Sequence, residues 1–222
     1  MNAQYHPSEE LLWSYGAGTL DQDSSLLIAT HLALCPQCRS TVKMVEGIGG
    51  DLIDKAYPAD NDIDALDNVM AKLSDTSFDK DEPVPTRFQE DIVSGITLPR
   101  PLRDHIARPL DELDWKWLGF GVRYTPIANR TMGTKIGLLR IAPNTKVPSH
   151  GHTGSEMTMV LSGGYSDSLG RFGVGDVEIA DDSTVHQPIS DSDAECICLV
   201  VISGQQVPTG IMAKVFRPLF TI

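Results

Sequence analysis

The first 78 residues contain apolar side chains at helical spacing, in four stretches separated by turn-forming residues. Apolar residues three or four positions apart lie on one face of a helix, and Asp, Pro and Gly commonly mark where helices begin and end. The pattern predicts a helix from Pro7 to Gly16 or Gly18, a second capped by Asp21 or Asp23, a third from Pro36 to the glycines at 47–50, and a fourth capped by Asp60 or Asp62. Four such short helices form only a thin core.

The predicted fourth helix carries a stripe of five apolar residues, namely Ile63, Leu66, Val69, Met70 and Leu73. A stripe of this kind usually faces a protein core. A small bundle need not bury every stripe, however, and an apolar helix face left exposed is a common way to bind a partner. The sequence leaves both interpretations open.

Beyond about residue 101 the pattern changes to the residue-by-residue alternation of strands. The predicted strands are Trp115–Tyr124, Lys135–Ala142, Glu156–Ser162, Val177–Ala180, Glu195–Ile202 and Ile211–Phe216. Many short strands separated by turn residues predict a sandwich or barrel. Residues 79–100 are rich in proline and predict a linker. We therefore expect an α+β protein of two domains, with a small all-α domain at 1–78 and an all-β domain at 101–222.

Composition excludes several classes of protein. The chain of 222 residues is long enough for one large domain or two small ones. No apolar run approaches the ~20 residues of a membrane span, and no basic-then-apolar secretion signal opens the sequence. Four cysteines do not make a disulfide framework in a chain of this length. These features predict a cytoplasmic protein without a membrane segment.

The charge is uneven along the chain. The net charge is −12, and residues 1–76 contain twelve acidic and four basic residues. Direct nucleic-acid binding needs Lys and Arg to displace counterions, so we expect none. An acidic surface suits a basic protein partner, although it can also serve only solubility.

A group of metal-ligand type lies where the second and third predicted helices meet. The stretch from His31 to Cys38 has the spacing H-x3-C-x2-C. Pro36 disfavours helical backbone at Cys35 and suits the first turn of a new helix, so a corner is expected there. One imidazole and two thiolates are three ligands of a tetrahedral zinc site, and His6 is the nearby candidate for the fourth. The two cysteines can also be a redox pair or small buried hydrophobes.

A second group lies in the β region and consists of His150, His152, Glu156 and His186. His150 and His152 are two positions apart, so both point to one side of a strand, and Glu156 has the same parity. Three imidazoles and a carboxylate converging inside a barrel form a site for zinc or another first-row metal such as iron, manganese or nickel. Each residue alone can equally be a polar residue at the barrel rim.

The spacing H-x-H-x3-E-x6-G, from His150 to Gly163, with a later Gly-Asp pair and His186, resembles the cupin family. This resemblance implies a double-stranded β-helix, or jelly roll, with these residues as metal ligands. Two positions depart from the family pattern. Asn144 replaces a usual glycine, a tolerable change at a turn, and Asp181-Asp182 replaces a common Pro-Gly.

The N-terminal motif resembles the zinc-binding anti-sigma domain. Both motifs in this order, joined by a proline-bearing linker, are similar to the ChrR-type anti-sigma factors, and the resemblance covers nearly the whole chain outside the linker. It implies a cytoplasmic protein that sequesters an extracytoplasmic-function-type sigma factor through its N-terminal helices. It also implies that the cupin-like domain governs release on an oxidative signal, such as singlet oxygen or a peroxide.

Several alternatives stay open at this point. Cys196 and Cys198 share one face of a predicted strand and are either inert core residues or an oxidation sensor beside the metal. The competing function is a cupin metalloenzyme, of dioxygenase or isomerase type, with the zinc module as a docking element. A separate zinc module with its own acidic charge bias favours a regulator that binds a sigma factor over an enzyme, because an enzyme does not explain that module. Because a linker separates the modules, we also expect each to fold alone and residues 1–78 to suffice for inhibition.

Overall fold

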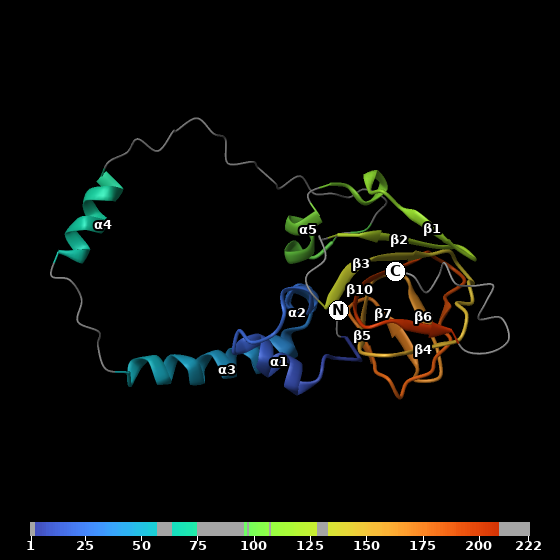
Figure 1. Cartoon of the computed structure of the whole chain (residues 1–222), viewed down its shortest axis with the longest axis horizontal. Helices are drawn as coiled ribbons and strands as arrows, with labels where there is room; N and C mark the ends of the chain where they lie inside the picture. Colours follow the sequence, from blue (N-terminus) through green and yellow to red (C-terminus); the bar gives the residue numbers. More distant parts are fainter. Residues whose placement is uncertain are drawn as a thin grey trace.

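The computed structural model describes residues 3–56, 64–74, 96, 98–106, 108–127 and 133–208. The predicted strand Ile211–Phe216, residue Ile63 and most of the predicted linker at 79–100 lie outside the described residues. The described part is a set of N-terminal helices followed by an antiparallel β-structure, so the predicted α+β class is confirmed (Figure 1). Within it, no helix is both long and apolar enough to cross a membrane.

The N-terminal helices are α1 (Glu9–Gly16), α2 (Gln22–Leu34), α3 (Pro36–Asp54) and α4 (Ala65–Ser74). Helix α1 begins two residues later than predicted, because the Ser8 side chain caps it by accepting the Leu11 N–H. Asp21 is the cap of α2 and accepts the Ser24 N–H. Helix α3 continues through the glycines at 47–50, where the sequence predicted its end. Glycine lowers helix stability but does not forbid the conformation, so those residues weaken the helix without ending it.

The region after the predicted linker begins with helical rather than β structure. Helix α5 (Arg100–Ile106) and the short 3-10 helix η1 (Leu110–Glu112) precede the first strand. Leu102 and Ile106 of α5 are buried, so this short helix is part of the core. The predicted strand Trp115–Tyr124 is a hairpin instead, because Gly119, Phe120 and Gly121 all have positive φ and turn the chain.

Among the described residues, the strands form three antiparallel sheets. The six-stranded sheet has the order β1 (Lys116–Gly119), β2 (Val122–Pro126), β3 (Thr134–Ile141), β10 (Cys196–Ser203), β5 (Glu156–Ser162) and β8 (Val177–Ala180). The three-stranded sheet has the order β7 (Arg171–Gly173), β6 (Gly164–Ser166) and β9 (Ile189–Ser190). Strand β11 (Gln206–Pro208) pairs with β4 (His150–His152).

Strand β10 shows how the large sheet divides two cores. Ile197, Leu199 and Val201 belong to one apolar cluster, whereas Cys196, Cys198, Val200 and Ile202 belong to the other. The first cluster also contains Leu27 and Ile28 of α2 and Leu102 of α5, so these helices pack on one face of the sheet (Figure 1). The second fills the inside of the barrel. Because both faces of β10 are buried, its sequence is a continuous apolar run.

The shared cluster changes one expectation. Two independently packed modules were expected, yet residues of α2 and of strands β3, β5 and β10 form one contiguous core. Leu27 and Ile28 are 0% exposed, and removing the sheet would expose both to water. Burying a side chain of this size stabilises a fold by about 1.5–3 kcal/mol. The helical region is therefore stabilised in part by the barrel.

Candidate metal centres

The N-terminal group forms at the corner between α2 and α3. His31 lies in the last turn of α2, Cys35 has extended backbone between the helices, and Cys38 lies in the first turn of α3 behind Pro36. His6 reaches the corner from the preceding arm. The ligand-type atoms of the four predicted residues lie within 4.8 Å of one another. The structure thus brings together the whole set that the sequence predicted.

The distances in this group fit a tetrahedral ion. Nε2 of His31 lies 3.3 Å from Sγ of Cys38, and Nδ1 of His6 lies 3.5 Å from the sulfurs of both Cys35 and Cys38. Ligands bound to zinc at ordinary Zn–N and Zn–S lengths in tetrahedral geometry are roughly 3.5 Å apart. Two nitrogens and two sulfurs are also a donor set that zinc prefers. These residues would hold the ion as a closed, four-ligand site.

Burial sets the protonation of this group. Burial lowers the pKa of His31, which keeps the ring neutral, as a ligand must be. Burial, together with the hydrogen bond to Cys35, raises the pKa of Cys38. The thiol therefore carries its proton in the absence of an ion, and zinc must displace it. On the other side of the His31 ring, Nδ1 lies 2.8 Å from the carbonyl oxygen of Gly175, which fixes Nδ1 as the donor and leaves Nε2 for the metal.

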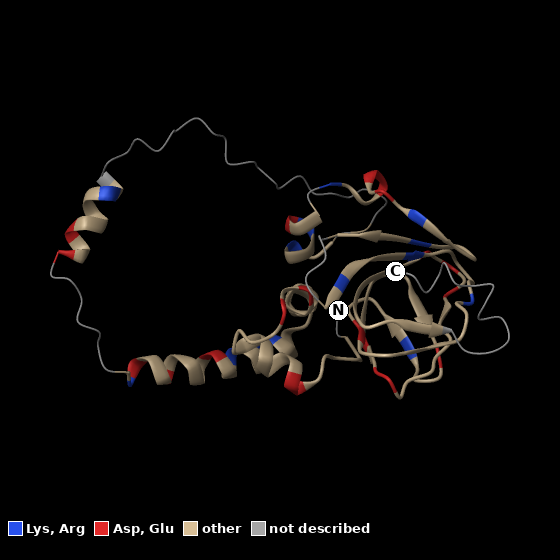
Figure 2. Ribbon diagram, in the orientation of Figure 1, with Lys and Arg blue, Asp and Glu red and all other residues tan. Residues whose placement is uncertain are grey.

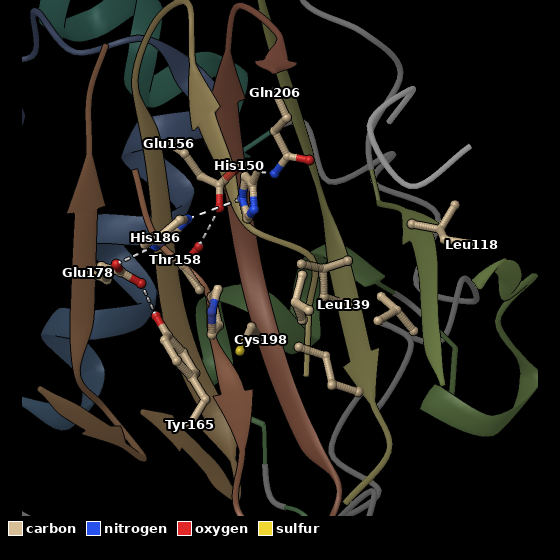
Figure 3. A pocket seen from close by; sticks show the side chains of 14 residues that line it. Leu118, Leu139, His150, Glu156, Thr158, Tyr165, Glu178, His186, Cys198 and Gln206 are labelled. Carbon is tan, nitrogen blue, oxygen red and sulfur yellow. Dashed lines mark hydrogen bonds and ion pairs between the residues drawn. The ribbon is translucent and has the colours of Figure 1, made fainter. Parts of the chain in front are cut away.

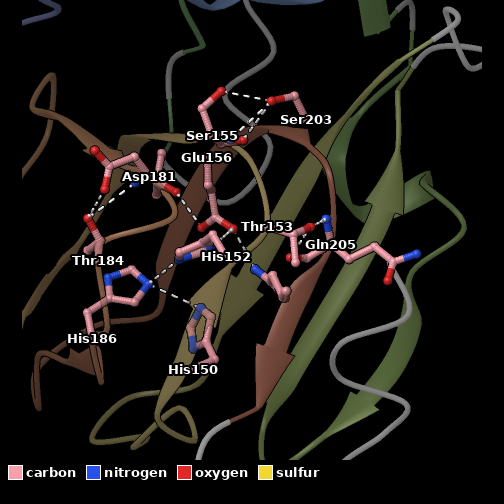
Figure 4. Close-up of polar contacts among 12 residues, drawn as sticks. His150, His152, Thr153, Ser155, Glu156, Asp181, Thr184, His186, Ser203 and Gln205 are labelled. Carbon is pink, nitrogen blue, oxygen red and sulfur yellow. Dashed lines mark hydrogen bonds and ion pairs between the residues drawn. The ribbon is translucent and has the colours of Figure 1, made fainter.

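The barrel group forms where β4 meets the segment that carries His186. Nε2 of His186 lies 3.1 Å from Nε2 of His150 and 3.3 Å from Nε2 of His152 (Figure 4). The backbones of His150 and His186 also exchange two hydrogen bonds of 3.1 Å, which sets the register of these two rings. All three imidazoles are buried, and their nitrogens lie within 4.8 Å of one another.

Glu156, the fourth predicted member, opens strand β5 beside this cluster. Its Oε2 lies 3.7 Å from Nδ1 of His152, on the side of the ring that faces away from the other two imidazoles. The carboxylate accepts hydrogen bonds from Gln206, at 2.5 Å, and from Thr158, at 3.2 Å. The structure thus brings three histidines together directly and places Glu156 next to them. Asn144, the departure from the cupin pattern, has φ of 53°, a left-handed conformation that asparagine tolerates.

A second layer of polar residues, which the sequence reasoning missed, holds His186. Its Nδ1 lies 2.8 Å from Oε1 of Glu178 and 3.2 Å from Oδ2 of Asp167. Burial alone lowers the pKa of His186, but the hydrogen bond and charge of Glu178 outweigh it, so the pKa is raised. The hydroxyl of Tyr165 donates a hydrogen bond to the other oxygen of Glu178. A carboxylate at an inward position of strand β8 was the signal in the sequence that could have revealed this layer.

A cavity opens beside the group and is lined by His150 and His186 (Figure 3). One wall is apolar and comes from Leu118, Val122, Leu139, Ile141 and Val147, and the other carries His150, Glu156 and His186. Burial lowers the pKa of His150, so its ring is neutral and able to bind a cation. Imidazole nitrogens with a nearby carboxylate suit a first-row divalent metal. An ion bound there would face the cavity and have room for a further ligand.

Cys198 lines the same cavity. Its sulfur lies 3.5 Å from that of Cys196, and both residues are buried. The hydrogen bond to Cys196 and burial raise the pKa of Cys198, which keeps the thiol protonated and a weak nucleophile at neutral pH. The predicted shared face of these cysteines is the barrel interior.

Comparisons with known proteins extend over both regions. The family model of the ChrR cupin-like domain matches residues 103–205. Anti-sigma-E factor ChrR of Cereibacter sphaeroides is 37% identical over 223 residues, which covers 100% of this chain and 100% of that protein. The crystal structure of Rhodobacter sphaeroides SigE in complex with the anti-sigma ChrR matches with a TM-score of 0.74 and 35% identity, over 91% of this chain and 100% of that chain.

Proposed function

Because the chain belongs to the family of ChrR-type anti-sigma factors, we propose that it sequesters an extracytoplasmic-function-type sigma factor through its N-terminal zinc domain. The similar solved structure is a complex of SigE with ChrR, which supports a sigma factor as the partner. In this proposal His6, His31, Cys35 and Cys38 hold zinc, and the ion fixes the corner between α2 and α3. No step of chemistry is required of this site, because its role is to keep the binding helices in place.

The observation that carries this proposal is the exposure of apolar residues on α3 and α4. Met44, Ile48 and Leu52 recur every four positions on α3 and are 57%, 52% and 66% exposed. On α4, Leu66, Val69, Met70 and Leu73 are each more than half exposed. The stripe that the sequence left between core and partner surface is therefore on the surface. Contiguous exposed apolar faces mark interaction sites, and amphipathic helices of this kind fit apolar grooves of a partner.

Charge supports the same partner class. The first 76 residues carry twelve acidic and four basic residues, and Figure 2 shows acidic residues on α1, α3 and α4. Such a surface attracts a protein that displays a basic surface, as DNA-binding proteins do.

The test uses the full chain and a sigma factor of the extracytoplasmic-function type from the same organism. Purified sigma factor should form a stable complex with the full chain, and zinc analysis should show metal bound to the N-terminal group. Val69→Glu places a charge in the α4 stripe and should weaken binding, whereas Asn68→Glu adds the same charge one position away. A complex that tolerates both substitutions equally would show that the interface lies elsewhere.

For the barrel we propose a sensing role, in which an oxidant or a small molecule at the metal favours release of the sigma factor. The support is the cavity lined by His150 and His186 of the three-histidine group, which leaves room for a further ligand on a bound ion. A ligand changes sigma-factor affinity only if it favours one arrangement of the protein over another. Release of sigma factor from the wild-type complex by singlet oxygen or hydroperoxide, and its loss in His152→Ala, would test this.

The same cavity is the observation that favours the second candidate, a cupin metalloenzyme of dioxygenase or isomerase type. Its apolar wall opposite the metal-type residues suits a small substrate with an apolar portion and a group that binds the ion. Turnover assays of the full chain loaded with iron, manganese or nickel distinguish the two. Turnover that is abolished by His152→Ala, together with no sigma-factor release, would favour the enzyme.

A further inference from the structure

The outer contacts of both metal centres converge on one short segment of the barrel, residues 173–178. This segment consists of the turn that ends β7 and the first two residues of β8. On its N-terminal side it contacts His31, a candidate zinc ligand, and the arm that precedes His6. At its C-terminal end it contacts His186 of the barrel group.

The contact with His31 is direct. The carbonyl of Gly175 accepts from Nδ1 of this ring at 2.8 Å. Gly175 has φ of +94°, a conformation that residues other than glycine rarely adopt, and this conformation sets the direction of its peptide groups. Its N–H donates to the carbonyl of Val160 at 2.9 Å, which anchors the turn in the barrel. The backbone of the barrel thus fixes the orientation of His31, one of the candidate zinc ligands.

The contact with His6 runs through the arm before it. The Asp176 carboxylate accepts the N–H of Gln4 at 2.5 Å and the N–H of Tyr5 at 3.0 Å. Val177 donates its N–H to the carbonyl of Tyr5 at 3.1 Å. The Tyr5 ring packs on Phe172 with a centroid distance of 4.5 Å. Two hydrogen bonds and an aromatic contact therefore hold Tyr5, the residue next to His6, on the barrel, and a third hydrogen bond holds Gln4 before it.

The contact with the barrel group follows one residue later. Glu178 lies 2.8 Å from Nδ1 of His186 and accepts the hydroxyl of Tyr165 (Figure 3). Tyr165 in turn stacks on Phe172, with a centroid distance of 5.1 Å, so the ring that supports Tyr5 also supports this tyrosine. Asp176, Val177 and Glu178 are consecutive. A shift of Glu178 that follows a change at His186 therefore has only Val177 between it and Asp176, which binds the arm.

We propose that this segment couples the two centres: Gly175 and Asp176 position the ligands of the N-terminal site, Glu178 positions His186, and the state of the barrel site thereby sets how firmly the N-terminal site holds its ion. Glu178, Asp176 and Tyr5 are positioning residues, because they act through ligands and not on the ion. Outer contacts of this kind typically change metal affinity by about 10–100-fold. The inference rests on the proposed zinc site.

The test follows cobalt in the N-terminal site of the full chain. Thiolate ligands give cobalt(II) an intense charge-transfer band, and the barrel group contributes no sulfur ligand, so the band reports the N-terminal site alone. The measured quantity is the rate at which the band decays after excess chelator is added. Tyr5→Ala and Asp176→Ala should accelerate the decay by roughly tenfold or more. Tyr5→Phe keeps the ring contact and should restore the wild-type rate.

Asp191→Ala is the matched control, since it removes a barrel carboxylate that pairs with Arg171 at 2.6 Å. It should leave the decay rate near that of the wild type. Coupling is tested with Glu178→Gln, His186→Ala and the double variant. Each single variant should change the rate several-fold, and the double variant should not exceed the larger single effect.

Two outcomes would overturn the inference. One is a decay rate in Asp176→Ala and Tyr5→Ala equal to that of Asp191→Ala, which would show that the barrel does not position the ligands. The other is a wild-type rate in His186→Ala, which would show that the centres are independent. Absence of the thiolate band from the wild-type protein is a different result, because it would refute the proposed zinc site itself.

Discussion

The two candidate metal centres differ in how they are enclosed, and the difference supports the separate roles proposed for them, structural for the first and sensing for the second. At the helix corner, two thiols and two imidazoles could supply all four ligands of a tetrahedral ion and leave no coordination position open. In the barrel, three imidazoles converge with a carboxylate beside them, and two of the three, His150 and His186, line a cavity with an apolar wall. A closed site holds a fold together, whereas an open one can bind a further molecule.

The centres also differ in where their ligands come from. Three of the four N-terminal ligands lie within eight consecutive residues, from His31 to Cys38, on two helices that meet at a proline. The three candidate imidazole ligands of the barrel come from β4 and from His186, which lies 34 positions after His152. The N-terminal site is thus built mainly by local geometry, and the barrel site depends on the whole β-fold.

The largest expected effect comes from removing the thiols. A Cys35→Ser, Cys38→Ser double variant should lose the N-terminal ion completely and, with it, detectable sigma-factor binding. Structural zinc contributes about 10–16 kcal/mol in zinc-finger peptides, more than the whole stability of most small domains. Metal analysis and co-purification measure the two effects.

A Cys196→Ala, Cys198→Ala double variant is the control for this prediction, because it removes the same number of thiols from the barrel interior. It should keep both the N-terminal ion and the complex. Full zinc content in the Cys35→Ser, Cys38→Ser protein would contradict the assignment of the closed site.

The next effect concerns the open site. His186→Ala should remove the barrel ion while the complex still forms at rest with saturating zinc, because the exposed stripes of α3 and α4 are untouched. The release of sigma factor by an oxidant should be lost. Metal content of the purified complex and the fraction of free sigma factor after exposure give the two readouts. Release at the wild-type level would place the sensor outside the barrel.

A smaller effect is expected on the binding surface. Val69→Glu should weaken the complex by about 10–100-fold, since placing a charge in an apolar contact costs roughly 1–3 kcal/mol. Val69 is 54% exposed, so the folded free protein should tolerate the change. Titration calorimetry compares it with Asn68→Glu, for which we expect little change. Equal loss in both variants would indicate a general effect of charge.

The smallest effect is that of salt. The acidic first 76 residues should steer a basic partner, so the association rate should fall by up to about tenfold between low and physiological ionic strength. The dissociation rate should change little, because the contacts that persist are apolar. Stopped-flow mixing measures both rates. An association rate independent of salt would show that the charge serves only solubility.

The predicted linker suggested that the barrel could be deleted to test the helical region alone, but the structure makes that deletion hard to interpret. Residues 1–78 were expected to suffice for inhibition, but Leu27 and Ile28 are buried against the sheet and α5 in the full chain. An isolated helical fragment would expose them. Point variants of the full chain separate the roles of the two regions without this complication.

Local chemistry in the sequence was enough to predict the residues that gather at the two candidate metal centres. The offsets between His31, Cys35 and Cys38 and the two-residue step from His150 to His152 place side chains on a common face, whatever surrounds them. Strand alternation likewise predicted the large sheet, although the hairpin at Gly119–Gly121 was missed because its turn lies inside an apolar run. The sequence analysis ended α3 at its glycines, but the helix continues through them, because glycine lowers helix stability without preventing the helical conformation.

Tertiary structure alone decided how the two regions meet. The bond from His31 to Gly175 joins residues 144 positions apart, and that from Gln4 to Asp176 joins residues 172 apart. No periodic pattern in the sequence around these residues predicts either contact. Repeating patterns in a sequence report neighbours on one helix or strand, whereas the pairing of distant segments depends on how whole surfaces fit. Hence the sequence by itself determined which residues can bind a metal, and only the fold determined that one barrel segment contacts both centres.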